Sequence, residues 1–305
     1  MNLSKKRLAA LVAIPGCVLL VVGGALFWLV NHAVHPPRIV EVVGETVTSL
    51  VRYEEVRFPS SDRVPLTGLL FRNRPGAPAV VLCHDSGGEK SRLMNIAVPL
   101  QKAGFVVLAF DFRGHGESDG NGTSFGIEEA RDILGAVRFL AKGDDQGRTP
   151  AEEVGVYGIG MGAHAAILAA REDVLIRALV LDGPYPDAGW KLRREMFGNS
   201  GFADRWLAAP SEFAFNFLRR TRIARYRAAD VLPALTGRDI LLIAPAGDHA
   251  LAEEVRTLFD TIPEQRNADG SLVTLPSAGA GTLFGENLQL YRQRVVTFFT
   301  SRLNP

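Results

Sequence analysis

A glycine stands where this chain has the spacing of a reactive serine. Residues Gly158-Ile159-Gly160-Met161-Gly162 follow the pattern G-x-S-x-G, except that Gly160 replaces the serine. In that pattern a sharp turn between a strand and a helix raises the central side chain above the edge of a sheet, beside backbone amides that stabilise an oxyanion. Glycine has no side chain that can attack a carbonyl carbon. The pattern therefore predicts the turn without the nucleophile.

The elements that must position this turn alternate between short β-type runs and helical patterns, which predicts a mostly parallel sheet covered by helices on both faces. An opening hairpin is expected at Val56–Phe58 and Leu66–Phe71. Buried strands are expected at Ala79–Cys83, Val106–Phe110, Val154–Tyr157, Ala178–Leu181, Ile240–Ala244 and Leu272–Leu275. Helices are expected near Leu93–Ala103, Ile127–Ala141, Met161–Arg171, Leu251–Ile262 and Leu288–Arg302. The interval Pro184 to Gly237 lacks a convincing strand and is interpreted as a helical lid, inserted after the sixth strand.

Three motifs follow three successive predicted strands. His84-Asp85-Ser86-Gly87-Gly88 follows the third strand, Asp111-Phe112-Arg113-Gly114-His115-Gly116-Glu117-Ser118 the fourth, and Gly158 to Gly162 the fifth. In these motifs and their order the chain resembles the α/β-hydrolase superfamily, across nearly everything after residue 37. The resemblance implies an α/β-hydrolase fold with a helical lid. In an active member it also implies a triad of serine, acid and histidine in that chain order.

The resemblance assigns the other two triad positions to Asp248 and Ala280. Asp248 ends the segment Leu241 to Asp248, and Ala280 stands in the histidine's place within Ser277 to Gly281. None of the six histidines lies after His249, so no histidine can follow the acid. Gly160, Asp248 and Ala280 are therefore the positions of a degenerate triad. Asp248 can instead cap a helix that begins at His249, and capping is the preferred interpretation.

The loop His84 to Gly88 and the amide of Met161 correspond to the oxyanion-hole region of the family site. Asp85 takes the place of the family's glycine in this loop, where a carboxylate would oppose a developing negative charge. The alternative is a displaced nucleophile, either Cys83 beside His84 or Ser86 within the loop. The ordinary interpretation of Cys83 is a buried core thiol.

Other residues carry no clear chemistry. Asp182 ends the sixth strand at a site used for the acid in some relatives, and His164 is expected to be a packed histidine of the helix after the elbow. The sequence has no His-x-x-x-His or Cys-x-x-Cys spacing and no dinucleotide fingerprint, so no metal and no cofactor are expected. Its two cysteines, Cys17 and Cys83, make an intramolecular disulfide implausible.

The N-terminal segment Leu8 to Val30 is uncharged and follows Lys5-Lys6-Arg7. At about 1.5 Å per residue it reaches roughly 35 Å, enough to cross a hydrocarbon core of about 30 Å. Residues 1–37 are therefore predicted to be a cytoplasmic N-terminus, a transmembrane helix and a linker, before a hydrolase-like domain at 38–305. A cleaved signal peptide, the alternative, has an apolar region of only about 7–15 residues. The basic residues place the N-terminus in the cytoplasm and the domain outside it, in the periplasm of a Gram-negative host.

The formal net charge of the 305 residues is +1, so no overall field favours nucleic acid as a partner. The predicted lid is locally basic. Its arginines lie on an expected helical run together with Phe213, Phe215 and Phe217: they are Arg219, Arg220, Arg222, Arg225 and Arg227. Such a run can rest on anionic headgroups or an acidic partner, or it can cover a pocket with its arginines in solvent. The whole pattern predicts a membrane-anchored pseudoenzyme that binds a protein partner or a small acyl-type ligand.

Overall fold

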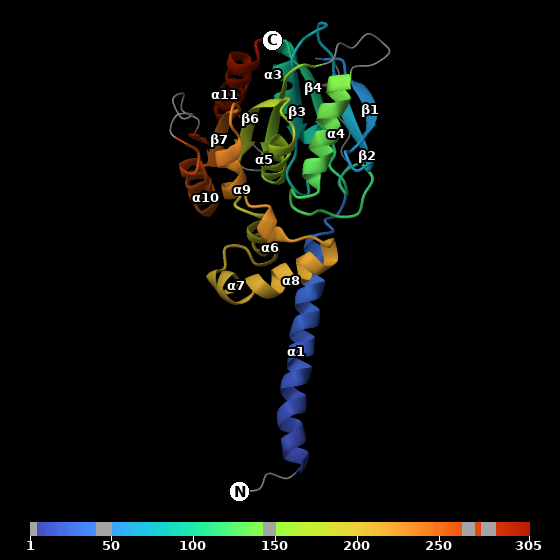
Figure 1. The fold of residues 1–305 in the computed structure, drawn as a ribbon, viewed down its shortest axis with the longest axis vertical. Coiled ribbons are helices and arrows are strands. Elements are labelled where there is room, and N and C mark those ends of the chain that lie inside the picture. The colour runs from blue at the N-terminus through green and yellow to red at the C-terminus, as the bar shows by residue number, and fades with distance from the viewer. Residues whose placement is uncertain (1–4, 41–50, 143–150, 264–271, 276–284) are drawn as a thin grey trace.

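The computed structural model describes residues 5–40, 51–142, 151–263, 272–275 and 285–305. These residues form an eight-stranded sheet with helices on both faces, and the long helix α1 (Lys5–Ala33) extends away from it (Figure 1). The helices α6 to α8 lie between the sheet and the exposed part of α1. The predicted α/β class, with one apolar helix at the N-terminus, is confirmed.

The strands lie in the order β1-β2-β4-β3-β5-β6-β7-β8. Their bounds are β1 Glu54–Pro59, β2 Pro65–Phe71, β3 Ala79–Cys83, β4 Val106–Phe110, β5 Val154–Ile159, β6 Ile176–Asp182, β7 Asp239–Pro245 and β8 Leu272–Leu275. β1 pairs antiparallel with β2, and β2 antiparallel with β4. The remaining pairs are parallel, so the carboxyl ends of β3, β5, β6 and β7 meet at one edge. All eight predicted strands are present; β3, β4 and β8 have the expected bounds, and the other five extend one to three residues beyond theirs.

Two apolar layers hold the helices to this sheet. Their bounds are α3 Met94–Lys102, α4 Glu129–Lys142, α5 Met161–Glu172, α10 His249–Asp260 and α11 Gly285–Leu303, with a short 3-10 helix η1 at Lys90–Leu93. α4, α5 and α10 share one buried cluster with one face of the sheet, whereas α3 and α11 share a second cluster with the other face. The strands are buried on both faces because helices cover both, which is why their sequences are apolar throughout.

Between β6 and β7 the backbone, all of which the structure describes, forms only helices and turns. They are α6 Ala188–Phe197, α7 Gly201–Trp206, α8 Ala208–Arg219, η2 Ile223–Arg225, α9 Ala228–Val231 and η3 Leu232–Ala234. The expected helical run of arginines is wrong beyond Arg219. Arg220 takes the left-handed conformation that ends α8, and only the single 3-10 turn of η2 follows before Arg227. A left-handed residue cannot continue a right-handed helix.

The lid encloses the last turns of α1 in an apolar cluster. Val30 of α1 and Val34, which directly follows the helix, are fully buried there with lid residues such as Phe215 and with Phe125 from the loop before α4. The chain beyond α1 is also held, because the Thr123 amide donates to the Val34 carbonyl at 2.7 Å. α1 is therefore packed into the folded domain at its carboxyl end.

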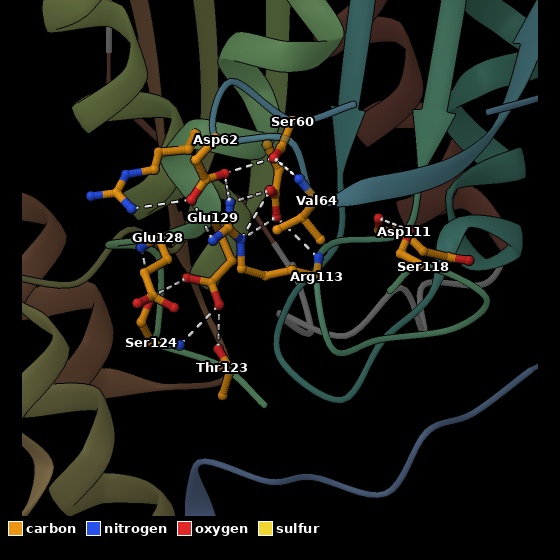
Figure 2. A network of polar contacts seen from close by, with 12 residues as sticks. Ser60, Asp62, Val64, Asp111, Arg113, Ser118, Thr123, Ser124, Glu128 and Glu129 are labelled. Atoms are coloured by element: carbon orange, nitrogen blue, oxygen red, sulfur yellow. Dashed lines mark hydrogen bonds and ion pairs between the residues drawn. The ribbon is translucent and has the colours of Figure 1, made fainter. Parts of the chain in front are cut away.

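Buried carboxylates fix the loops that follow β4 (Figure 2). Asp132 accepts hydrogen bonds from Arg113 at 2.7 Å, and Arg113 also donates to Asp62 at 2.6 Å. Glu129 accepts from the Ser124 hydroxyl at 2.6 Å and from the Ser124 amide at 2.9 Å. Buried carboxylates stay ionised only with such partners. These contacts therefore tie the loops to the sheet edge beside them.

Candidate functional site

The elbow between β5 and α5 keeps its strained geometry although its central residue is glycine. Gly160 has φ 50° and ψ −106°, and its amide donates to the Asp182 carbonyl at 2.8 Å. A Cβ on Gly158 would overlap the backbone of Gly162, and a Cβ on Gly162 would overlap that of Cys83. The two flanking glycines therefore let β3, β5 and α5 approach closely, and the turn persists as architecture.

The carboxylate of Asp85 occupies the space above Gly160. A Cβ at position 160 would lie 2.8 Å from Asp85 Oδ2 and closer still to Oδ1. The Met161 amide, which follows the nucleophile position, donates to Asp85 Oδ1 at 2.7 Å. The loop is held in this position by a turn in which the Gly88 amide donates to the Asp85 carbonyl at 2.9 Å. One internal carboxylate thus occupies both the place of a serine side chain and the oxyanion amide.

A lysine from the lid reaches the same carboxylate. Lys191 Nζ in α6 lies 3.4 Å from Asp85 Oδ2 and 2.9 Å from Glu195 Oε1, and its side chain is 13% exposed. The ammonium group lies 6.0 Å from the centre of the Tyr185 ring. Burial alone lowers the pKa of Lys191, but the two carboxylates outweigh this effect and raise it. Lys191 therefore stays charged and balances the negative charge at Asp85.

His84 is committed to the backbone and cannot serve as a base here. Its Nε2 accepts from the Phe112 amide at 3.1 Å, so the ring proton lies on Nδ1, which donates to the Asp85 carbonyl at 2.7 Å. Burial and the nearby His115 lower the pKa of His84 to about 4. The neutral ring joins the loop after β3 to the loop after β4, and its role is to position Asp85.

The two alternative nucleophiles lie in different surroundings. Cys83 is fully buried at the end of β3, and burial raises the pKa of its thiol, followed by the charge of Asp132. A thiol that remains protonated in the core is unreactive. Ser86 is half-buried in the loop next to Asp85. Among the described residues, neither Cys83 nor Ser86 has a neighbouring base that an acidic group orients.

Asp248 is engaged in two structural contacts. Its Oδ1 accepts from the Leu251 amide at 3.0 Å and caps α10, and its other oxygen forms an ion pair with Arg194 of the lid. His249 is exposed as the first residue of α10. The predicted capping role is confirmed. Ala280 lies outside the described residues.

Asp182 and His164 face other parts of the core. Asp182 Oδ2 accepts from the Tyr291 hydroxyl of α11 at 2.6 Å, and that hydroxyl is 2.7 Å from the Tyr157 hydroxyl. His164 is fully buried and stacks on Tyr185 at 4.8 Å, as expected of a packed histidine. Among the described residues no group of three or more His, Cys, Asp or Glu side chains could hold a metal ion.

Lys191 is the part of this site that sequence reasoning missed. Lys191 lies in the basic lid, and its partner Asp85 is 106 positions away along the chain. The only local signal is a lysine within the first helix of the lid, next to the buried Leu192 and after Asp187, which caps α6. That pattern predicts a helix with one buried face but does not identify an ion pair.

Comparisons with known proteins agree with the fold. Residues 75–232, which are more than half of the chain, match the family described as serine aminopeptidase, S33. The thiohydrolase aneE of Aspergillus aculeatus is 32% identical over 142 residues, covering 46% of this chain and 44% of that protein. The chain therefore matches less than half the length of that relative. The polyketide transferase af380 of Aspergillus fumigatus is 23% identical over 299 residues, covering 82% of this chain and 99% of that protein.

Solved structures show the same architecture. The esterase Pf2001 of Pyrococcus furiosus has a TM-score of 0.67 at 24% identity, covering 89% of this chain and 99% of that one. Est1E of Butyrivibrio proteoclasticus, solved with ferulic acid, has a TM-score of 0.60 at 20% identity, covering 82% of this chain and 100% of that one. The chain therefore belongs to the serine aminopeptidase S33 family, within the α/β-hydrolase superfamily.

Proposed function

We propose that this protein is a membrane-anchored pseudoenzyme of the α/β-hydrolase superfamily that acts by binding a small acyl-type ligand or a protein partner. The observation that carries the proposal is the Asp85 carboxylate, which accepts the Met161 amide at 2.7 Å and fills the space above Gly160. An oxyanion hole must present its donors to a charge that develops during the reaction. Here a fixed negative charge already holds that donor.

The alternative of a displaced nucleophile finds little support in the geometry. Cys83 is fully buried with a raised thiol pKa, and His84 uses both ring nitrogens for backbone contacts. A nucleophile needs a base within about 2.6–3.2 Å that a third group orients. Ser86 and Cys83 have no such base among the described residues, so binding is the better hypothesis.

The test is activity-based labelling of the full chain in detergent micelles. Fluorophosphonate and iodoacetamide probes should label the folded protein no more than they label variants Cys83→Ala and Ser86→Ala, and short-chain nitrophenyl esters should not turn over above background. Gly160→Ser with Asp85→Gly and Ala280→His serves as the positive comparison, since it restores the three missing features of the site. Specific labelling or ester turnover of the natural chain that is lost in either alanine variant would overturn the proposal.

The anchoring role of α1 is supported by its composition and by its contacts. Residues Ala13–Ala33 have a mean hydropathy of 2.3, and only 6% of the most apolar stretch of this helix is buried by the rest of the protein. Val30 and Val34 belong to the core of the lid, and the Arg38 guanidinium donates to the carbonyls of Ser118 at 2.6 Å and Gly120 at 2.7 Å. Cleavage as a signal peptide would remove part of that core, which favours a retained helix.

A carbonate-extraction experiment on the expressed chain tests this part. The protein should stay with the membrane fraction at its full length, and externally added protease should digest the domain in spheroplasts while residues before α1 stay protected. Release of a shortened chain would mean that α1 is a cleaved signal. Protection of the domain would place it in the cytoplasm.

A further inference from the structure

The lid exposes three large aromatic side chains on the part of the domain nearest to α1. Trp206 of α7 is 62% exposed, and Phe213 and Phe217 of α8 are 74% and 69% exposed. Phe213 and Phe217 are four residues apart and therefore share one face of α8. The neighbouring Phe215 is fully buried on the opposite side. Isolated apolar residues are common on protein surfaces, but several exposed aromatic residues on neighbouring helices mark an interaction surface.

This aromatic surface lies at the level where the apolar part of α1 ends. The rings of Phe217 and Phe27 are 6.4 Å apart between centroids. Phe27 is three residues before Val30, the last residue of the uncharged run, so it lies about 4.5 Å inside the end of that run. An amphipathic helix at a membrane surface buries its apolar face about 5–10 Å into the boundary between headgroups and acyl chains. Figure 1 shows α7 and α8 running across the axis of α1 at this level.

The level of the folded domain along α1 is fixed by contacts that do not involve the aromatic surface. The Val34 carbonyl accepts from the Thr123 amide, and a Cβ on Gly122 would overlap that carbonyl. Trp28, 63% exposed, stacks on His32 with ring centroids 5.6 Å apart. Tryptophan prefers the interface between membrane and water. The position of Trp28 therefore indicates the same interface that α8 would occupy.

Exposed arginines flank the aromatic side chains. The Arg205 guanidinium lies 5.6 Å from the centre of the Trp206 ring, and Arg220 is exposed at the end of α8. Arginine can extend along an apolar surface while its charged end stays with phosphate groups. Arg193 and Arg219, by contrast, form ion pairs with Glu212 and Glu128 inside the molecule.

From these contacts we infer that α7 and α8 lie in the surface of the same bilayer that α1 crosses. Trp206, Phe213 and Phe217 insert between the headgroups, and Arg205 and Arg220 bind lipid phosphates. The inference rests on the proposed anchoring by α1, and it is independent of whether the site is catalytic. One side of the lid would then face lipid, and the other side would contact Asp85 through the Lys191 side chain.

The three tryptophans of the chain, Trp28, Trp190 and Trp206, allow a direct test. Three full-length variants each keep one tryptophan and carry phenylalanine at the other two positions. They are reconstituted into vesicles of phosphatidylcholine and phosphatidylglycerol, with or without bromine on the acyl chains, which quenches nearby indole fluorescence. Trp206 should be quenched at least about twofold more than Trp190, because an insertion depth of about 5–10 Å brings its indole close to the acyl chains. Trp190, half-buried beside Tyr185, is the matched control.

The outcomes separate this inference from the anchoring on which it rests. Quenching of Trp28 without quenching of Trp206 would overturn the membrane position of the lid and leave the anchor intact. Absence of quenching at Trp28 would overturn the anchor itself. Shielding of Trp206 from both brominated lipid and aqueous acrylamide would show that protein, such as a second copy of the chain, covers the lid, and this too would overturn the inference.

Two further variants test the residues themselves. Phe213→Ser with Phe217→Ser, made in the chain that keeps only Trp206, should reduce the quenching of Trp206 at least about twofold, while the same pair in the Trp28 chain should leave its quenching unchanged. Both residues are exposed, so the pair should not affect folding. Unchanged quenching of Trp206 would refute the role of α8. Arg205→Gln with Arg220→Gln should weaken the quenching of Trp206 more in vesicles that contain phosphatidylglycerol than in vesicles of phosphatidylcholine alone, and an equal effect in both would overturn the role of the two arginines.

Discussion

Gly160→Ser tests the position of Asp85 most directly. A side chain at φ 50° and ψ −106° costs about 1–3 kcal/mol in backbone strain. Its Cβ overlaps the Asp85 carboxylate, which must then leave the Met161 amide that it accepts at 2.7 Å. Since a hydrogen bond to a charged group contributes about 1.5–3 kcal/mol, the free energy of unfolding should fall by about 2.5–6 kcal/mol in total.

The same substitution should cost less when Asp85 has been replaced by glycine. In the Asp85→Gly background only the strain remains, so Gly160→Ser should lower the free energy of unfolding by about 1–3 kcal/mol. The coupling between the two positions is then about 1.5–3 kcal/mol, well above the roughly 0.3–0.5 kcal/mol expected of independent sites. Both proteins compared in this background, Asp85→Gly and Asp85→Gly with Gly160→Ser, lack the carboxylate that faces Lys191. The free-energy cost of losing that ion pair therefore cancels between them.

The assay is urea unfolding of the four full-length proteins in detergent micelles, followed by circular dichroism. Gly76→Ser is the matched control, because Gly76 has φ 77° with no atom near its Cβ position. Gly76→Ser should lower the free energy of unfolding only through backbone strain, and by the same amount with or without Asp85. Equal costs of Gly160→Ser in both backgrounds would refute the position assigned to the Asp85 carboxylate.

Three other predictions concern the supports of the site. Burial lowers the pKa of His84 and His164 to about 4 from 6.5, so at these two residues the unfolded chain binds protons that the folded chain does not, and their contribution to stability should fall as the pH falls from 6.5 towards 4. Each histidine should contribute a loss of about 2 kcal/mol at pH 5, whereas the raised pKa of Asp132, about 7, acts in the opposite direction; the stability of His164→Asn, followed by thermal melting, should therefore differ in its pH dependence from that of the natural chain by about 2 kcal/mol. Glu129→Gln should lower the free energy of unfolding by about 1–3 kcal/mol, because the amide places hydrogens against the donors of Ser124 and Gly126, whereas Glu153→Gln in an exposed pair should change it by less than about 1 kcal/mol. Asp248→Ala should cost about 1 kcal/mol through loss of the cap on α10, and Asp248→Ser should restore most of it, with urea midpoints as the measure; loss from both variants alike would contradict the capping role.

The sheet could be predicted from the sequence because each buried strand is a short apolar run bounded by turn residues. Ala79–Cys83, Val106–Phe110 and Leu272–Leu275 have the bounds expected of them. The elbow could also be predicted, since Gly158 and Gly162 are needed for close packing whatever residue stands between them. Both features depend on local pattern, and local pattern is what a single sequence records.

The occupied site could be predicted only in part. Asp85 was recognised as a charge in the wrong place, but its contact with the Met161 amide depends on a loop 76 residues away along the chain. The same limit applies to two arginines of the lid, whereas Arg220, Arg222, Arg225 and Arg227 are exposed. Arg194 and Arg219 form ion pairs with Asp248 and Glu128, at separations of 54 and 91 residues. Charge composition alone cannot distinguish a solvated arginine from one paired across the fold.

The contact between Asp85 and the empty position at Gly160 also constrains how this lineage can change. A single substitution to serine at 160 loses stability, because it displaces the Asp85 carboxylate from the Met161 amide, and it adds no base that could accept the serine proton. A single substitution at Asp85 removes one of the two carboxylates that balance the charge of Lys191, and it restores no nucleophile. Each of these substitutions is therefore unfavourable alone, so selection that acts on one substitution at a time cannot readily replace the carboxylate at this site with a serine.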